Sequence, residues 1–125
     1  MKIQPCISVL LLVTLLSGCA TSPRISYHQD VYPVLQQNCF ACHTPPHGAG
    51  YLKTGLDLTS YESLMRGSAY GPVITPGNSR QSTLNMLVEG RAGPSMRMPR
   101  DRDHPLTDRE ITILRLWVDQ GAKDN

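Results

Sequence analysis

Apolar residues return every three or four positions in several parts of the chain, and this spacing predicts amphipathic helices. The first such segment begins near Asp30 and places Val31, Leu35 and Cys39 on one face. The last lies near the C-terminus and contains the single tryptophan, Trp117. The chain between them is rich in loops and does not alternate as strands do. The pattern therefore predicts an all-α fold.

The predicted helices begin at residues that commonly cap helix N-termini. Asp30 is the expected cap of the first helix. Two capping-box patterns, Thr59–Glu62 and Thr107–Glu110, are expected to open a short helix and the final helix. Another helix between these two is expected to begin at Ser79 or Ser82.

Glycines are expected to end three of these helices, at Gly67, Gly90 and Gly121. Residues 44–58 and 91–105 are rich in glycine and proline, and we expect them to be irregular. In the final helix, the side chains expected in the core are Ile113, Leu114, Trp117 and Val118.

The N-terminal residues have the pattern of a bacterial export signal. Lys2 is basic, and the apolar run Ile7–Leu16 is too short to span a bilayer as a stable helix. The run ends in Leu16–Cys19, which resembles a lipobox. In such signals the cysteine, here Cys19, becomes the N-terminus and carries several acyl chains, which anchor a protein to a lipid membrane. An ordinary cleaved signal with an incidental cysteine is the alternative.

Processing of this signal would divide the chain into a signal peptide (1–18), a lipidated tether (19–26) and one domain (27–125). A chain of 125 residues is long enough for one domain and too short for two ordinary ones. The two residues after Cys19 do not include the aspartate that retains some lipoproteins on the inner membrane. We therefore expect the periplasmic face of the outer membrane.

Composition limits the partners, cofactors and cross-links that the chain is expected to have. The formal net charge of +2 gives no indication of a nucleic-acid partner. One Trp and one Phe leave few large rings to fill a core, so a buried macrocycle would supply apolar volume. Within the domain, only Cys39 and Cys42 remain as a possible pair, so a disulfide framework is not expected.

Residues 39–43 have the C-x-x-C-H pattern of covalent haem attachment. The thiols of Cys39 and Cys42 can form thioethers with the two haem vinyl groups. His43 then lies under the iron, where an imidazole nitrogen can bind it as the proximal ligand. The sequence therefore predicts one covalent haem c per chain.

A C-x-x-C pair has two other common uses, a redox dithiol and half of a zinc site. The dithiol motif belongs to a βαβ context, and zinc needs two more ligands at matching spacing. Neither context follows Cys42 in this sequence.

The second axial ligand is expected to be a methionine. Met98 lies in a predicted loop directly before Pro99, which restricts Met98 to extended backbone and offers no competing N–H group. Met96 is the fallback, and a His-ligated or open site is a further alternative. Other candidates are Met65 and Met86, in helical patterns, and His28, His47 and His104.

These features together resemble a small class I cytochrome c domain and, more narrowly, the planctomycete-type cytochrome c domain. The resemblance covers about residues 27–125. Its motifs are Val31–Leu35 leading into the haem motif, Gly55–Leu58, Pro76–Ser82, Met98–Pro99, and Leu106–Trp117 with Gly121–Ala122. It implies an all-α fold of short helices around one haem, with first and last helices crossing, His43 proximal and Met98 distal.

The predicted function is single-electron transfer between periplasmic or membrane redox partners, without enzymatic activity. One alternative is a peroxidase-like haem enzyme, for which His104 is the only candidate acid or base. Another is a sensor in which a small ligand displaces Met98.

Arginines near Met98 raise the possibility of a docking face for an acidic partner. They are interrupted by Asp101, Asp103 and Asp108, so a solvated loop of mixed charge is the simpler interpretation. The arginines concerned are Arg91, Arg97, Arg100, Arg102 and Arg109.

Overall fold

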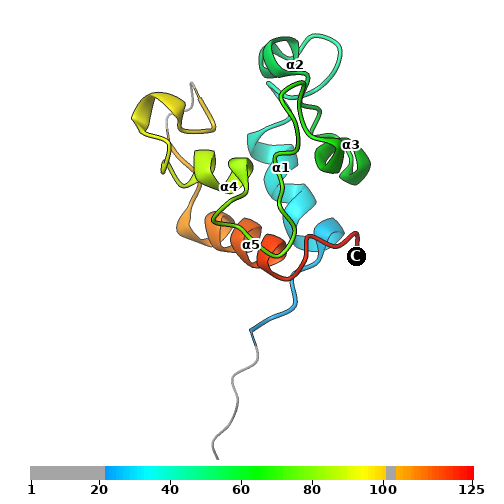
Figure 1. Cartoon of the computed structure of the whole chain (residues 1–125), viewed down its shortest axis with the longest axis vertical. Helices are drawn as coiled ribbons and strands as arrows, with labels where there is room; N and C mark the ends of the chain where they lie inside the picture. Colours follow the sequence, from blue (N-terminus) through cyan, green and yellow to red (C-terminus); the bar gives the residue numbers. More distant parts are fainter. Residues whose placement is uncertain (1–21, 101–103) are drawn as a thin grey trace, which may run out of the picture.

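The computed structural model of the chain describes residues 22–100 and 104–125. The predicted signal peptide, the acylated Cys19 and most of the tether lie outside these residues. The described part is helical, and its only β-type pairing is an isolated bridge between Ser68 and Gly71. The predicted all-α fold is confirmed. Along the chain the elements are η1 (Tyr27–Val31), α1 (Tyr32–Asn38), α2 (Ala49–Thr54), α3 (Tyr61–Arg66), α4 (Thr83–Val88), η2 (Pro94–Met96) and α5 (Asp108–Asp119) (Figure 1).

The first helix begins earlier than predicted. The hydroxyl of Ser26 accepts a hydrogen bond from Gln29 N–H and is the N-cap, so the assignment of this role to Asp30 was wrong. The Asp30 carboxylate instead accepts from Ser26 N–H at 2.8 Å, one turn back. This opening turn is a π-helix, and Pro33 falls at the start of α1, where a missing N–H costs little.

The segment 44–58 is not wholly irregular, because it contains the short helix α2. This helix ends at Gly55, whose φ of +67° is the left-handed conformation of many helix C-termini. The capping box of α3 lies one residue later than predicted, with Ser60 and Ser63 bonded reciprocally. Thr59 instead donates to the Asp57 carboxylate through both its N–H and its hydroxyl.

The C-terminal half follows the predictions closely. α4 begins after Ser82 and gives way to Gly90, and α5 opens with the Thr107–Glu110 capping box. Within α5, Leu114, Trp117 and Val118 are buried as expected. Ile113, which was also expected in the core, is only partly buried, and Ile111 is buried in its place.

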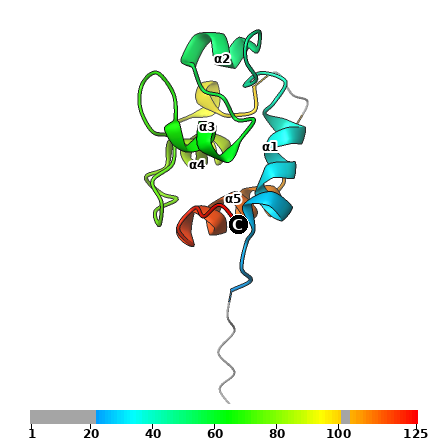
Figure 2. The same cartoon turned by 90° about the vertical axis from the view of Figure 1, so that its right-hand side faces the viewer.

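The core lies where η1 and α1 cross α5 (Figures 1 and 2). Tyr27 and Trp117 are each 1% exposed and their ring centroids are 5.6 Å apart. Trp117 donates its indole N–H to Lys123 O, which confirms it as a core residue. Burial, followed by neighbouring negative charges, raises the pKa of Tyr27 to about 12. These rings hold the first and last helices together as the resemblance implied.

In the described part of the chain, we find no helix with both the length and the apolar character needed to cross a membrane.

Candidate haem-binding site

The C-x-x-C-H motif continues directly from the end of α1. Cys39 is the C-cap of this helix, and its carbonyl accepts from Cys42 N–H at 3.1 Å and His43 N–H at 2.9 Å. These bonds wind the motif into a tight turn. Cys39 is half-buried, Cys42 is exposed, and no disulfide joins them. No disulfide therefore competes with thioether formation at this turn.

The His43 side chain is held by the segment that follows it. Its Nδ1 lies 3.3 Å from Leu56 O, a bond that requires the proton on Nδ1 and leaves Nε2 as the basic nitrogen. Burial lowers the pKa of His43, and the Leu56 bond opposes this only in part. The neutral ring is therefore favoured, and Nε2 is its unprotonated nitrogen, the atom that a metal would bind.

Gly50 lies directly against the His43 ring. A Cβ at this position would approach His43 Cε1 to 2.6 Å and Nε2 to 2.7 Å, closer than side chains pack. The chain of α2 can pass the imidazole only without a side chain here. The backbone N–H of the next residue, Tyr51, donates to Cys42 O at 2.9 Å and ties α2 to the cysteine turn.

Met98 is supported by α4. It is half-buried against the edge of the core, and its N–H donates to Leu87 O at 3.1 Å, at the C-terminal end of that helix. Met96 is 45% exposed, and its sulfur lies 3.7 Å from an Arg100 guanidinium nitrogen. The packing of Met98 suits the role predicted for it better than that of Met96.

The two segments that carry the predicted axial ligands lie on different sides of the molecule. Residues 39–56, including α2, occupy one side above α1, and residues 91–100 occupy the other beyond α4 (Figures 1 and 2). Iron ligation by His43 and Met98 remains a prediction.

The remaining histidines are either exposed or paired with another residue. His28 pairs with Asp124 at 2.9 Å, and His47 and His104 are exposed. Among residues 22–100 and 104–125, no three His, Cys, Asp or Glu side chains gather as a metal-ion cluster would require.

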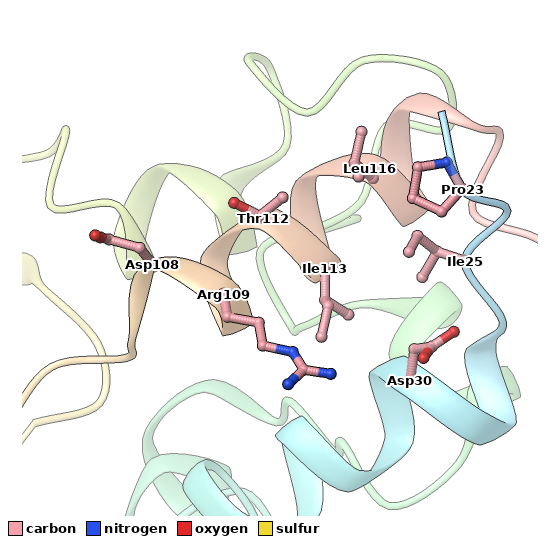
Figure 3. A pocket seen from close by; sticks show the side chains of 8 residues that line it. All are labelled: Pro23, Ile25, Asp30, Asp108, Arg109, Thr112, Ile113 and Leu116. Carbon is pink, nitrogen blue, oxygen red and sulfur yellow. The ribbon is translucent and has the colours of Figure 1, made fainter. Parts of the chain in front are cut away.

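A surface groove lies elsewhere, between the N-terminal segment and α5. Figure 3 shows its apolar walls, Pro23 and Ile25 on one side and Ile113 and Leu116 on the other, with Asp30 and Arg109 nearby. None of the predicted haem-site residues lines it. It is therefore not the site that the motif predicts.

Three observations test whether these residues fit a haem. The neutral His43 offers Nε2, the donor that haem iron takes from a proximal histidine. α2 has no buried residue, and its Leu52 is 68% exposed, as expected of a helix whose apolar partner is not protein. In α4, the fully buried Asn85 carboxamide has no protein hydrogen-bond partner, as a polar group beside a bound ligand would. The residues fit.

The fold and the site together define the class of protein. It is an all-α domain that carries a haem c attachment motif and a histidine held in one orientation. The chain belongs to the planctomycete cytochrome c family, whose sequence profile matches residues 39–101, half of the chain. This family implies covalent haem c and a haem-based redox function. No curated protein and no solved structure matches the chain.

Sequence reasoning did not identify Leu56, Gly50 or Asn85. Leu56 acts through its backbone carbonyl, which no side-chain pattern reveals. Gly50 could be read as one more loop glycine until the ring beside it is seen. Asn85 did carry a signal, because it is a polar residue between Leu84 and Val88 on the buried side of α4.

Proposed function

We propose that this chain is a monohaem c-type cytochrome that carries single electrons between redox partners. Cys39 and Cys42 would hold one haem through thioethers, His43 would bind the iron from the proximal side and Met98 from the distal side. The observation that carries this proposal is the His43 ring, neutral and oriented by Leu56 O beside the two thiols.

When bound, haem supplies a one-electron Fe(III)/Fe(II) couple, and the chain has to hold both oxidation states with little movement. On the proximal side, Leu56 and Gly50 fix the imidazole so that its direction need not change. On the distal side, the Met98 thioether would favour the ferrous ion and raise the reduction potential. Two protein ligands leave no open position for a substrate, so the function is transfer rather than catalysis.

We also propose that the protein is lipid-anchored through Cys19, at the periplasmic face of the outer membrane. Support comes from the lipobox pattern, since Cys19 lies only a few residues before the point where the chain joins the domain beside α5, with Ile25 buried there. The tether would let the domain reach partners near the membrane while one end stays fixed.

The test is a pair of measurements on protein produced in a host that makes c-type cytochromes. Absorption spectra should show low-spin haem in both oxidation states, with the weak red charge-transfer band of sulfur-ligated ferric haem. Mass spectrometry should show one haem added to the wild type and none to a Cys39→Ala, Cys42→Ala variant. A high-spin ferric wild type would contradict the electron-carrier proposal.

A further inference from the structure

One wall of the groove in Figure 3 is the outward side of α5. Its residues are three or four positions apart and therefore share one side of the helix. They are Arg109, Thr112, Ile113 and Leu116. Thr112 is exposed, and both Ile113 and Leu116 are only partly buried. The side of α5 that faces away from the core thus carries two aliphatic side chains that the protein covers only in part.

The other wall is the segment 23–25, which is fixed to the domain. The Gln120 carboxamide binds this segment at two points, since its Nε2 donates to Pro23 O at 2.8 Å and its Oε1 accepts from Ile25 N–H at 2.9 Å. The Asn125 carboxamide donates to Ile25 O at 3.2 Å, and the Ile25 side chain is buried. From Pro23 onward, the chain is therefore held against the end of α5.

This attachment leaves a very short connection to Cys19. Only three residues separate Cys19 from Pro23 in the sequence. An extended chain spans at most about 3.6 Å per residue, so the groove wall at Pro23 lies within about 14 Å of Cys19. A short tether gives the tethered surface an effective concentration on the order of millimolar at its target. With Cys19 acylated as proposed, even a weak affinity of the groove for lipid would therefore hold it at the membrane.

The side chains around the groove suit the boundary between acyl chains and phosphate groups. Arg24 and Arg109 are exposed and lie on its two walls, beside the aliphatic residues. Arginines in such positions bind lipid phosphates, while aliphatic side chains enter the headgroup region. The groove also contains two carboxylates. That of Asp30 accepts from Ser26 N–H at 2.8 Å, and Asp108 lies in the first turn of α5, where a negative charge stabilises the helix.

The predicted haem-attachment turn lies away from the groove. In both views, α2 is at the end of the molecule opposite to residues 22–26 (Figures 1 and 2). The motif is tied to α2, because Tyr51 N–H donates to Cys42 O at 2.9 Å. A domain that rested on a membrane through the groove would therefore direct this turn toward the water.

We propose that the groove and its rim rest on the surface of the phospholipid bilayer that holds Cys19. We call this surface the lipid face; its residues are Pro23, Arg24, Arg109, Thr112, Ile113 and Leu116. The proposal rests on the proposed acylation of Cys19 and goes beyond it, because an anchor alone leaves the domain free to turn in any direction. The lipid face fixes one orientation, with α5 at the lipid and α2 in the water.

The experiment uses the acylated, haem-loaded chain in vesicles of phosphatidylethanolamine and phosphatidylglycerol. A nitroxide label is attached to Thr112→Cys, in the lipid face, or to Tyr70→Cys as the matched control site. Tyr70 is 83% exposed, and its neighbour Ala69 is bonded to Thr54 at the end of α2. Electron paramagnetic resonance compares the access of each label to oxygen, which concentrates in lipid, and to a nickel chelate, which stays in water. The haem is kept ferrous, because low-spin ferrous iron is diamagnetic and does not disturb the label.

On vesicles, the Thr112 label should lose nickel access severalfold relative to the Tyr70 label and should gain oxygen access. The reason is that an interfacial face lies about 5–10 Å deep in the headgroup region. An Arg24→Glu, Arg109→Glu variant should regain nickel access at Thr112, since each basic residue near an anionic surface contributes roughly fivefold to binding. The matched variant Lys53→Glu, Arg66→Glu makes the same change in net charge at exposed positions of α2 and α3 and should leave Thr112 protected.

Mass spectrometry of Cys19 separates the two proposals. A Thr112 label as open to nickel as the Tyr70 label, on an acylated chain, would overturn the lipid face and leave the anchor standing, whereas an unacylated Cys19 would overturn both. Equal loss of protection in the two charge variants would overturn the lipid face, because only net charge would then matter. Protection that grows with the number of chains per vesicle would overturn it in favour of a second copy. Low-spin haem spectra establish that each variant is folded.

Discussion

The two predicted axial ligands are supported in different ways. His43 is fixed on several sides: its backbone is bonded to Cys39 O, its Nδ1 faces Leu56 O, and Gly50 lies against its ring. Met98 has one backbone bond, to the end of α4, and lies in a segment of mostly exposed residues.

This difference divides the predicted haem site into two parts. We call the part around His43 the rigid half and the part around Met98 the adjustable half. The rigid half combines the attachment motif with the helix α2, so proximal geometry is determined by local contacts. The adjustable half depends on a segment that can move without disturbing the core. Loss of the proximal ligand should therefore abolish the site, whereas loss of the distal one should only change its properties.

The largest effect is expected for His43→Ala. Without the proximal ligand, the haem content of purified protein should fall below about a tenth of that of the wild type, since even indirect changes around a metal ligand cost 10–100-fold in affinity. The measurement is the haem-to-protein absorbance ratio. His47→Ala is the control, because His47 is exposed and should be dispensable. A His43→Ala protein that keeps a full complement of low-spin haem would contradict the proximal assignment.

Met98→Ala should have the next largest effect. Haem should remain covalently attached, but the red charge-transfer band should disappear and the potential should fall by about 0.1 V or more, within the roughly 0.8 V range that axial ligands span. Voltammetry and the ferric spectrum measure both changes. His104→Ala should leave both unchanged. A Met98→Ala spectrum identical to that of the wild type would show that another group binds the iron.

Much of this picture was accessible from the sequence, because its main signals are local. The Thr107–Glu110 capping box and the helix stop at Gly90 depend on neighbouring residues alone, and both were placed correctly. The C-x-x-C-H motif likewise places two thiols and an imidazole within one turn, whatever the rest of the chain does.

The errors arose where the capping and hydrophobic patterns of the sequence are ambiguous or absent. Asp30 has the residue type of an N-cap, but Ser26 lies one turn earlier and caps the helix by accepting from Gln29 N–H. The Asp30 carboxylate closes the same turn by accepting from Ser26 N–H. α2 was overlooked because it is short and buries nothing within the protein, so no hydrophobic stripe marks it. The contact between Gly50 and the imidazole cannot be read from spacing, since it depends on how α2 folds back over the motif.

Gly50→Ala tests the rigid half directly. In an open helical position, this change would stabilise the fold by about 0.5–1 kcal/mol. Here the Cβ would meet the His43 ring, so we expect destabilisation by about 1–3 kcal/mol and a shifted potential. Denaturant unfolding and voltammetry measure the two effects.

Gly77→Ala is the comparison for Gly50→Ala. Gly77 has a φ of +80° and no neighbour within 4 Å of its Cβ position, so the substitution strains the backbone alone. It should reduce stability but leave the potential unchanged. A stabilised Gly50→Ala protein with an unaltered potential would show that the imidazole is not confined by α2.

The smallest effect is expected for Met96→Leu, which decides between the two methionines of the adjustable half. Met96 is exposed and its sulfur lies near the Arg100 guanidinium, so its replacement should leave the ferric spectrum and the potential unchanged. Leucine keeps the volume and removes only the sulfur, which isolates ligation from packing. If Met96→Leu abolishes the red band while Met98→Leu keeps it, the distal ligand is Met96. Met96, two residues before Met98, would then have to face the iron. The hydrogen bond from Met98 N–H to Leu87 O would in that case fix the backbone of the segment 91–100 and would not position the iron ligand.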